Sequence, residues 1–426
     1  MSPVTDLSDL HPGAPDVDLV SALVYWTTWV HRRVEAVELL EGERARRRVS
    51  VDLTVLPIAA PGLPEQVVVP LATAAKRTMR RLDVVDDTGR SLPILGAEDN
   101  GVLSAAFLAD LIASETGEVD DQLREALQEV VQADAPVAAR VAAGLVRRYG
   151  LAGTLSQEFL VRLAHEFVLF ALLPAERAGS RLVVKYSYHW ETNELAMRTS
   201  GWQRVAASLG LRPYPVALEI SAVDTAASVH IEIPAPPGLR CVDMVVSDDD
   251  EGGVLVRDDG GGTVAHAHAR FGPMVRYVTA TARFDPDRAG LHRMITWAAF
   301  GIAVLFVTTG LRLGAVASSP PGTPVSLLLF APALLLTWLV RPGESALVAR
   351  VVGPLRVVAI ALATLLFLAG VALATEAGSP TSAPAGVVTV CWWVGATVSL
   401  VAGTVLAVGS FCIGRRARSG GARDER

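Results

Sequence analysis

Long apolar segments in the last third of the chain constrain its fold more than any other feature. Four of them stand out, at about 294–313, 324–340, 357–375 and 386–414. A helix of roughly 20 apolar residues crosses the hydrocarbon core of a bilayer, where it satisfies its own backbone hydrogen bonds. The pattern therefore predicts a C-terminal transmembrane domain of four helices at 291–414, followed by a basic tail at 415–426.

The second segment, 324–340, is the shortest of the four and contains Pro332. If it does not span, three helices remain and the C-terminus lies on the other side. Ionisable side chains are missing from these segments, except for Arg312 at one edge. Transport pathways usually carry such side chains inside the membrane. The pattern thus favours an anchor, and a small transporter or transporter accessory subunit is an alternative.

Arginines gather on one side of the four-helix arrangement. They occupy the flank before the first segment, the loop between the second and third segments, and the tail, whereas the other two loops contain only Arg312. Cytoplasmic flanks of membrane proteins are enriched in basic residues. We therefore expect a multi-pass protein of the inner (plasma) membrane with both termini in the cytoplasm. The arginines are Arg283, Arg288, Arg293, Arg341, Arg350, Arg356, Arg415, Arg416, Arg418, Arg423 and Arg426.

The region before residue 291 is acidic. It holds 28 of the 38 basic and 40 of the 44 acidic residues, which argues against nucleic acid as a partner. Arginine outnumbers lysine so strongly that we infer a GC-rich bacterial coding sequence. The three cysteines provide no disulfide framework and fit a reducing compartment. The first residues contain acid and proline, so no secretory signal peptide is expected there.

Alternating apolar residues predict a β-rich domain at 31–290. In RRVSVDLTV, Val49, Val51 and Leu53 share one face of a strand, and RVEAVELL upstream completes a hairpin with it. A second hairpin is expected around Asp87 and Gly89, and a third joins FVLFALLP to RLVVKYSYHW. Residues 98–165 have helical spacing instead. The predicted fold class is α+β: a cytosolic, antiparallel, sandwich-like or barrel-like domain with a helical insertion, followed by the four-helix transmembrane bundle.

Residues 1–30 are expected to form an N-terminal tail and an amphipathic segment. Leu19, Leu23, Trp26 and Val30 have the spacing of one helical face. Two interpretations are open. Either the helix packs on the core of the domain, or Trp26 and Trp29 rest on the bilayer surface.

One pattern resembles a metal site. His266 and His268 in TVAHAHARF are two residues apart and share a strand face, and Asp249 lies in an acidic turn nearby. Imidazole and carboxylate are common ligands of divalent metals, although turns are rich in solvated aspartate in any case. The polar-face histidines His189 and His230 are expected to extend the same surface if their strands are neighbours.

Signatures of catalysis are missing from the sequence. It contains no nucleophile elbow, phosphate loop, dinucleotide fingerprint or zinc-protease helix. We therefore predict a non-enzymatic binding, sensor or scaffold module that needs no cofactor. Its expected partners are the lipid bilayer and a cytosolic or membrane protein. The alternative from another class is a metal-dependent hydrolase that uses His266, His268 and Asp249.

Overall fold

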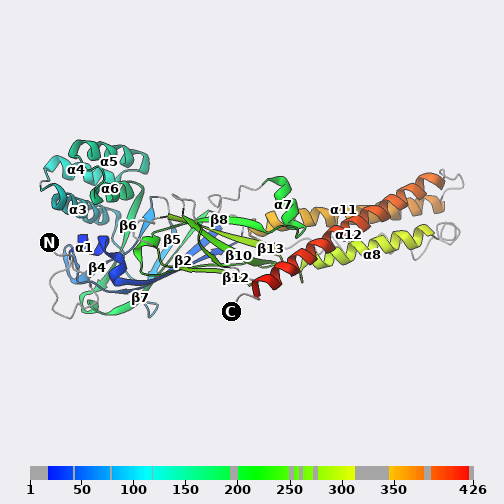
Figure 1. Cartoon of the computed structure of the whole chain (residues 1–426), viewed down its shortest axis with the longest axis horizontal. Helices are drawn as coiled ribbons and strands as arrows, with labels where there is room; N and C mark the ends of the chain where they lie inside the picture. Colours follow the sequence, from blue (N-terminus) through cyan, green and yellow to red (C-terminus); the bar gives the residue numbers. More distant parts are fainter. Residues whose placement is uncertain are drawn as a thin grey trace.

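The computed structural model describes residues 18–41, 44–76, 79–117, 119–191, 200–248, 254–258, 262–271, 277–311, 345–378 and 385–421. They form an elongated molecule with three parts (Figure 1). A β-rich body lies in the middle. A cluster of four helices, α3 to α6, sits at one end, and the long helices α8, α11 and α12 extend from the other.

The largest sheet has six strands in the order β12-β9-β1-β2-β7-β5. β1 and β2 form the predicted hairpin, in which Val37 is opposite Arg47. All neighbours in this sheet are antiparallel except β1 and β9, which run parallel. The strands are β1 (Val30–Leu39), β2 (Arg44–Thr54), β5 (Arg80–Val85), β7 (Arg181–Glu191), β9 (Val229–Pro234) and β12 (Val264–Ala269).

A second, four-stranded antiparallel sheet has the order β11-β10-β13-β8. Its strands are β8 (Tyr214–Ser221), β10 (Leu239–Asp248), β11 (Val254–Asp258) and β13 (Tyr277–Pro286). In both sheets one side of each long strand is buried, and these side chains meet in a common apolar core. Val49, Val51 and Leu53 lie in that core as predicted. The body is therefore mixed α+β with a sandwich-like, mainly antiparallel β region.

The prediction of a third hairpin was wrong. β6 (Glu166–Pro174) pairs with β4 (Leu63–Ala75) in a separate three-stranded sheet with β3 (Ala59–Ala60), while β7 pairs with β2 and β5. The reason lies in the residue pattern. β6 is buried on both faces, as a continuous apolar run requires, whereas β7 alternates. By contrast, the predicted turn at Gly89 forms, with a bridge between Val85 and Ser91.

Four helices follow one another between β5 and β6, in the part of the sequence with helical spacing. They are α3 (Ala97–Thr116), α4 (Asp121–Gln132), α5 (Ala135–Tyr149) and α6 (Leu155–His165). The side chain of Asp120 caps α4 and that of Thr154 caps α6. The Asn100 amide of α3 donates to the carbonyl of Val168 on β6, so the helices are fixed to the three-stranded sheet.

The N-terminal segment packs on the body. It forms two short helices, α1 (Leu19–Val24) and α2 (Trp26–Trp29). Trp26 and Trp29 stack at 5.4 Å and are almost fully buried. Both rings are part of the protein core, so the interpretation of a foot on the bilayer was wrong.

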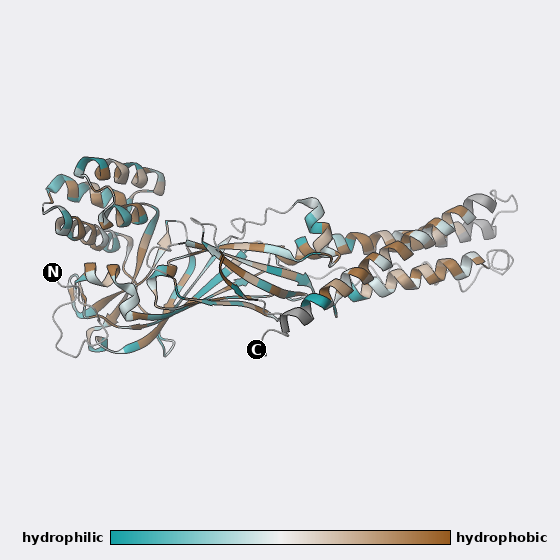
Figure 2. Cartoon of the chain, in the orientation of Figure 1, coloured by the Kyte–Doolittle hydropathy of each residue, from teal (hydrophilic) through white to brown (hydrophobic). Residues whose placement is uncertain are grey.

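Within the part of the chain that the structure describes, three helices are long and apolar enough to span a membrane: α8 (Leu291–Leu311), α11 (Ala346–Gly378) and α12 (Ala385–Gly421). Figure 2 shows their predominantly hydrophobic colouring. Large apolar side chains such as Val304, Val357 and Val398 are exposed along them, as lipid contact requires. The C-terminal region is therefore suited to a membrane. The predicted span at 324–340 lies outside the described residues.

Candidate functional site

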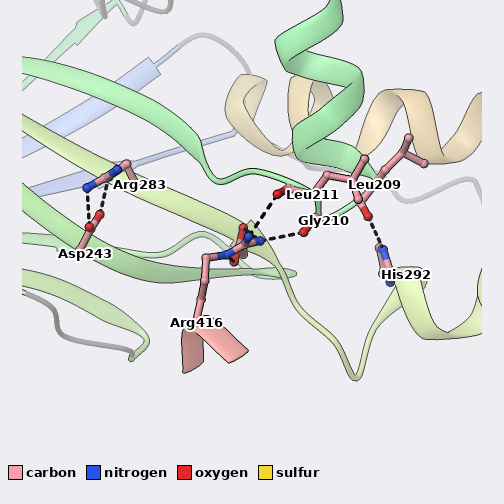
Figure 3. Close-up of polar contacts among 8 residues, drawn as sticks. Leu209, Gly210, Leu211, Asp243, Arg283, His292 and Arg416 are labelled. Carbon is pink, nitrogen blue, oxygen red and sulfur yellow. Dashed lines mark hydrogen bonds and ion pairs between the residues drawn. The ribbon is translucent and has the colours of Figure 1, made fainter. Parts of the chain in front are cut away.

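A polar junction joins the β-rich body to the apolar helices (Figure 3). Arg416 of α12 donates two hydrogen bonds to the Asp285 carboxylate of β13, at 2.8 and 2.9 Å. Its guanidinium also donates to the carbonyls of Gly210 and Leu211, at 2.7 and 3.2 Å. The Asp285 side chain is only 1% exposed. Burial raises the pKa of Asp285, and the Arg416 charge opposes that effect.

The loop 209–211, which follows α7 (Gly201–Ser208), is the centre of this junction. The Leu209 carbonyl lies 3.3 Å from Nε2 of His292 on α8, and the Ser208 hydroxyl donates to the Val351 carbonyl of α11. Together with the Arg416 contacts on α12, residues 208–211 contact the three described apolar helices. The end of α7 and the loop 209–211 thus connect these helices to strand β8, which follows in the sequence.

Close packing at the junction depends on glycine. A Cβ on Gly409 of α12 would lie 1.7 Å from the Leu209 carbonyl oxygen. Gly210 has φ +74°, a left-handed conformation that favours glycine. Gly395 and Gly403, further along α12, make room for the rings of Phe306 and Phe300 in the same way.

A second feature is a cavity of about 870 Å³ between α3, α4 and the β4–β6 sheet. Its size is within the roughly 300–1,000 Å³ of typical small-molecule sites. The apolar part of its wall includes Leu82, Leu95, Val131, Phe167 and Leu169. Hydrogen-bonding groups come from Glu98, Asn100, Gln128, Gln132 and Asp134.

Among the described residues that line this cavity, Lys76 is the cationic one. Its Nζ donates to the carbonyls of Val130 and Ala133 at the end of α4, at 2.7 and 3.1 Å. Burial lowers the pKa of Lys76 to about 8, while Asp134 acts in the opposite direction. None of the described residues that line the cavity is Ser, Thr, Cys or His.

The structure brings some of the predicted histidines together. His268 is opposite His230 in the β12–β9 pair, and their rings stack at 4.1 Å. His266 is opposite Glu232 on the same face. His189 lies on β7, three strands away from β9 in the sheet order. Burial lowers the pKa of His230, with smaller contributions from Arg32, His268 and His266.

No metal-binding group of three His, Cys, Asp or Glu side chains is found within the described ranges. Asp249 lies outside those ranges, so the predicted set of His266, His268 and Asp249 stays a prediction.

Sequence reasoning missed a buried charge cluster between the two large sheets. Arg33 Nη2 donates to Glu35 at 3.2 Å and to the Tyr186 hydroxyl at 3.0 Å, and Arg47 Nε lies 3.0 Å from Glu35. Arg47 also donates to the Glu219 carbonyl of β8 at 2.8 Å, which connects the sheets. One signal was present in the sequence. Arg47 is two residues before Val49, so the alternation of a strand places it on the same inward face as Val49, Val51 and Leu53.

Neither a comparison with protein-family models nor a search of curated proteins returns a match for this chain.

Proposed function

We propose that the protein is a membrane-anchored, non-catalytic binding module whose acidic, β-rich body faces the cytoplasm. The cavity beside Lys76 carries this proposal. It combines apolar walls with amide, carboxylate and ammonium groups, which is the usual composition of a small-molecule site. We expect a small ligand with an apolar body and a hydrogen-bonding edge.

The junction supports a sensor role over passive anchoring. A flexible linker would be enough to hold a body at a membrane, but here Arg416, Asp285 and the loop 209–211 form direct polar contacts. A change in β8 or β13 is therefore able to reach α8, α11 and α12 without an intervening flexible segment. Transport has less support, because 295–311, 357–372 and 389–414 contain no Asp, Glu, Lys or Arg.

Ligand binding is tested by thermal unfolding of the full-length protein in detergent against a library of small amphiphilic metabolites. Compounds that raise the melting temperature are then tested on Gln128→Trp, which places a ring at the cavity wall, and on Glu129→Trp. Glu129 is exposed on α4 but does not line the cavity. We expect the shift to be lost only in Gln128→Trp. A shift that persists in Gln128→Trp would place the ligand elsewhere, and no shift with any compound would contradict the proposal.

Orientation is tested separately. Reporter fusions after each apolar helix, combined with protease treatment of spheroplasts, are expected to show a protected body and a cytoplasmic C-terminus. Digestion of the body from outside would reverse the orientation, and an external C-terminus alone would indicate three spans.

A further inference from the structure

A groove at the body-proximal end of α8 and α12 combines charge with exposed aromatic surface. Its volume is about 600 Å³. The turn before α8 and its first turn contribute Arg288 and Arg293, and Trp297 and Phe300 follow on the same helix. From α12 come Ser410 and Phe411.

These groups are ordered along the bundle axis. Arg288 lies at the level of Gly414 on α12, and Phe300 lies at the level of Gly403. Gly403 and Gly414 are eleven positions apart, which corresponds to about 16 Å of helix at 1.5 Å per residue. The groove therefore changes from cationic near the body to aromatic deeper along the apolar helices, over the distance from a lipid headgroup to its upper acyl chains.

Both arginines are available for a ligand. Within the described part of the chain, neither Arg288 nor Arg293 forms an ion pair or a side-chain hydrogen bond, in contrast to Arg416. None of the described residues that line the groove is Asp or Glu. The nearby Asp287 carboxylate accepts a hydrogen bond from the Ala289 backbone N–H.

The aromatic side chains point to lipid rather than to a soluble anion. Trp297 is 66% exposed and Phe411 is 64% exposed, although both are large and apolar. Tryptophan is enriched where a membrane meets water. A free anion would not contact the exposed aromatic rings beside the arginines, whereas the acyl chains of a lipid would cover them.

We propose that this groove binds the phosphate group of an anionic phospholipid, with Arg288 and Arg293 on the phosphate and the aromatic rings beside the acyl chains. Guanidinium groups recognise phosphate through paired hydrogen bonds. The proposal rests on the membrane embedding in the proposed function. It does not depend on the cavity beside Lys76 or on a ligand there.

Binding is measured by native mass spectrometry of the full-length protein in detergent, with dioleoyl phosphatidylglycerol and dioleoyl phosphatidylcholine as probes. We expect a preference for the anionic lipid that falls by up to about 30-fold in Arg288→Gln/Arg293→Gln, since each arginine near an anionic surface contributes roughly fivefold. The matched control is Arg204→Gln/Arg415→Gln. It removes two exposed arginines at the same end of the helices, outside the groove.

Three results would overturn the proposal. They are an unchanged preference in Arg288→Gln/Arg293→Gln, an equal loss in the control pair, and displacement of the lipid by inorganic phosphate, which would indicate a site for a soluble anion. Because Gln128→Trp leaves this groove intact, lipid binding in that variant separates failure of this proposal from failure of the ligand cavity. Equal melting temperatures of the two double variants would show that folding is not the cause.

Discussion

Arg416 and Asp285 are 131 residues apart in the sequence, yet their side chains form a two-point ion pair where the last apolar helix meets strand β13. The carboxylate is buried, and the arginine also holds the carbonyls of Gly210 and Leu211. A helix of the apolar bundle and a strand of the body therefore share one charge pair. Any displacement of α12 relative to β13 must break or stretch it.

Removing one member of this pair should destabilise the protein more than removing both. Loss of one partner in a buried pair leaves an uncompensated charge. We expect Arg416→Met to lower the free energy of unfolding by about 2–3 kcal/mol, below the usual 3–5 kcal/mol because the arginine is partly exposed. The double variant Arg416→Met/Asp285→Leu should recover part of the loss. Thermal unfolding of all variants in detergent tests this, and strictly additive effects would show that the two residues are not coupled.

Gly409 offers a test of the close approach at the junction. Gly409→Ala brings a methyl group against the Leu209 carbonyl, so we expect a loss of at least ~2 kcal/mol from overpacking. Gly301→Ala on α8 is the matched control, because a Cβ there meets nothing within 4 Å. It should leave the melting temperature unchanged or slightly higher, since alanine favours helix. Similar behaviour of the two variants would argue against a rigid contact at the loop 209–211.

The charge cluster between the sheets is expected to depend on Glu35. Glu35→Gln leaves the buried guanidinium groups of Arg33 and Arg47 without a counter-charge, and should cost about 3 kcal/mol. Glu38→Gln on the same strand removes a pair with Arg48 in which both side chains are more than a third exposed. Exposed pairs contribute little, so that control should change stability by less than about 1 kcal/mol. An equally small effect of Glu35→Gln in denaturant unfolding would mean that water or rearrangement compensates the arginines.

His230 should make stability depend on pH below neutrality. Its folded-state pKa is lower than the unfolded value of 6.5, so the unfolded chain binds more protons in the window just below pH 6.5. Stability should therefore fall as the pH decreases through that window, and His230 should have no such effect above it. In His230→Thr the dependence of stability on pH should be weaker. Part of it should remain, because the pKa values of His31 and His189 are also lowered. Identical slopes for both proteins between pH 5 and 7 would contradict this assignment.

Local pattern predicted part of this fold, and long-range pairing explains the rest. The alternation around Val51 gave the β1–β2 hairpin because its strands are neighbours in sequence and its pattern has a period of two. β6 pairs across the helical insertion with β4, and nothing in its own residues names that partner. A charged residue within an alternating pattern is also informative. Arg47 lies at a core position of β2, where the other inward-facing residues are apolar.

The site residues were harder to predict for the same reason. His230 and His268 lie side by side because β9 and β12, which are far apart in the sequence, are paired. The positions of the two histidines on polar strand faces were consistent with this pairing but did not establish it. Arg416 looked like one of several basic residues that set topology, and only the tertiary structure places Asp285 beside it. Lys76 gave no sequence signal at all. Its position depends on where α4 ends against the sheet.

Lys76 permits a direct chemical test of its surroundings, because Lys76 and Lys185 are the only lysines in the chain. Their rates of reductive methylation can be followed separately by mass spectrometry of the full-length protein. The rate at Lys76 should rise with pH to a midpoint near 8, since only the neutral amine reacts and burial lowers its pKa to about 8. Lys185 is exposed and serves as the internal reference.

The same pKa shift should make stability depend on pH. In the unfolded chain Lys76 keeps its ordinary pKa of 10.5, so the unfolded chain binds more protons than the folded protein between pH 8 and 10.5. Stability should therefore rise with pH across that window relative to Lys76→Met. A Lys76 rate that still increases steeply at pH 10, or a ligand that binds in the cavity without protecting this amine, would remove Lys76 from the proposed site.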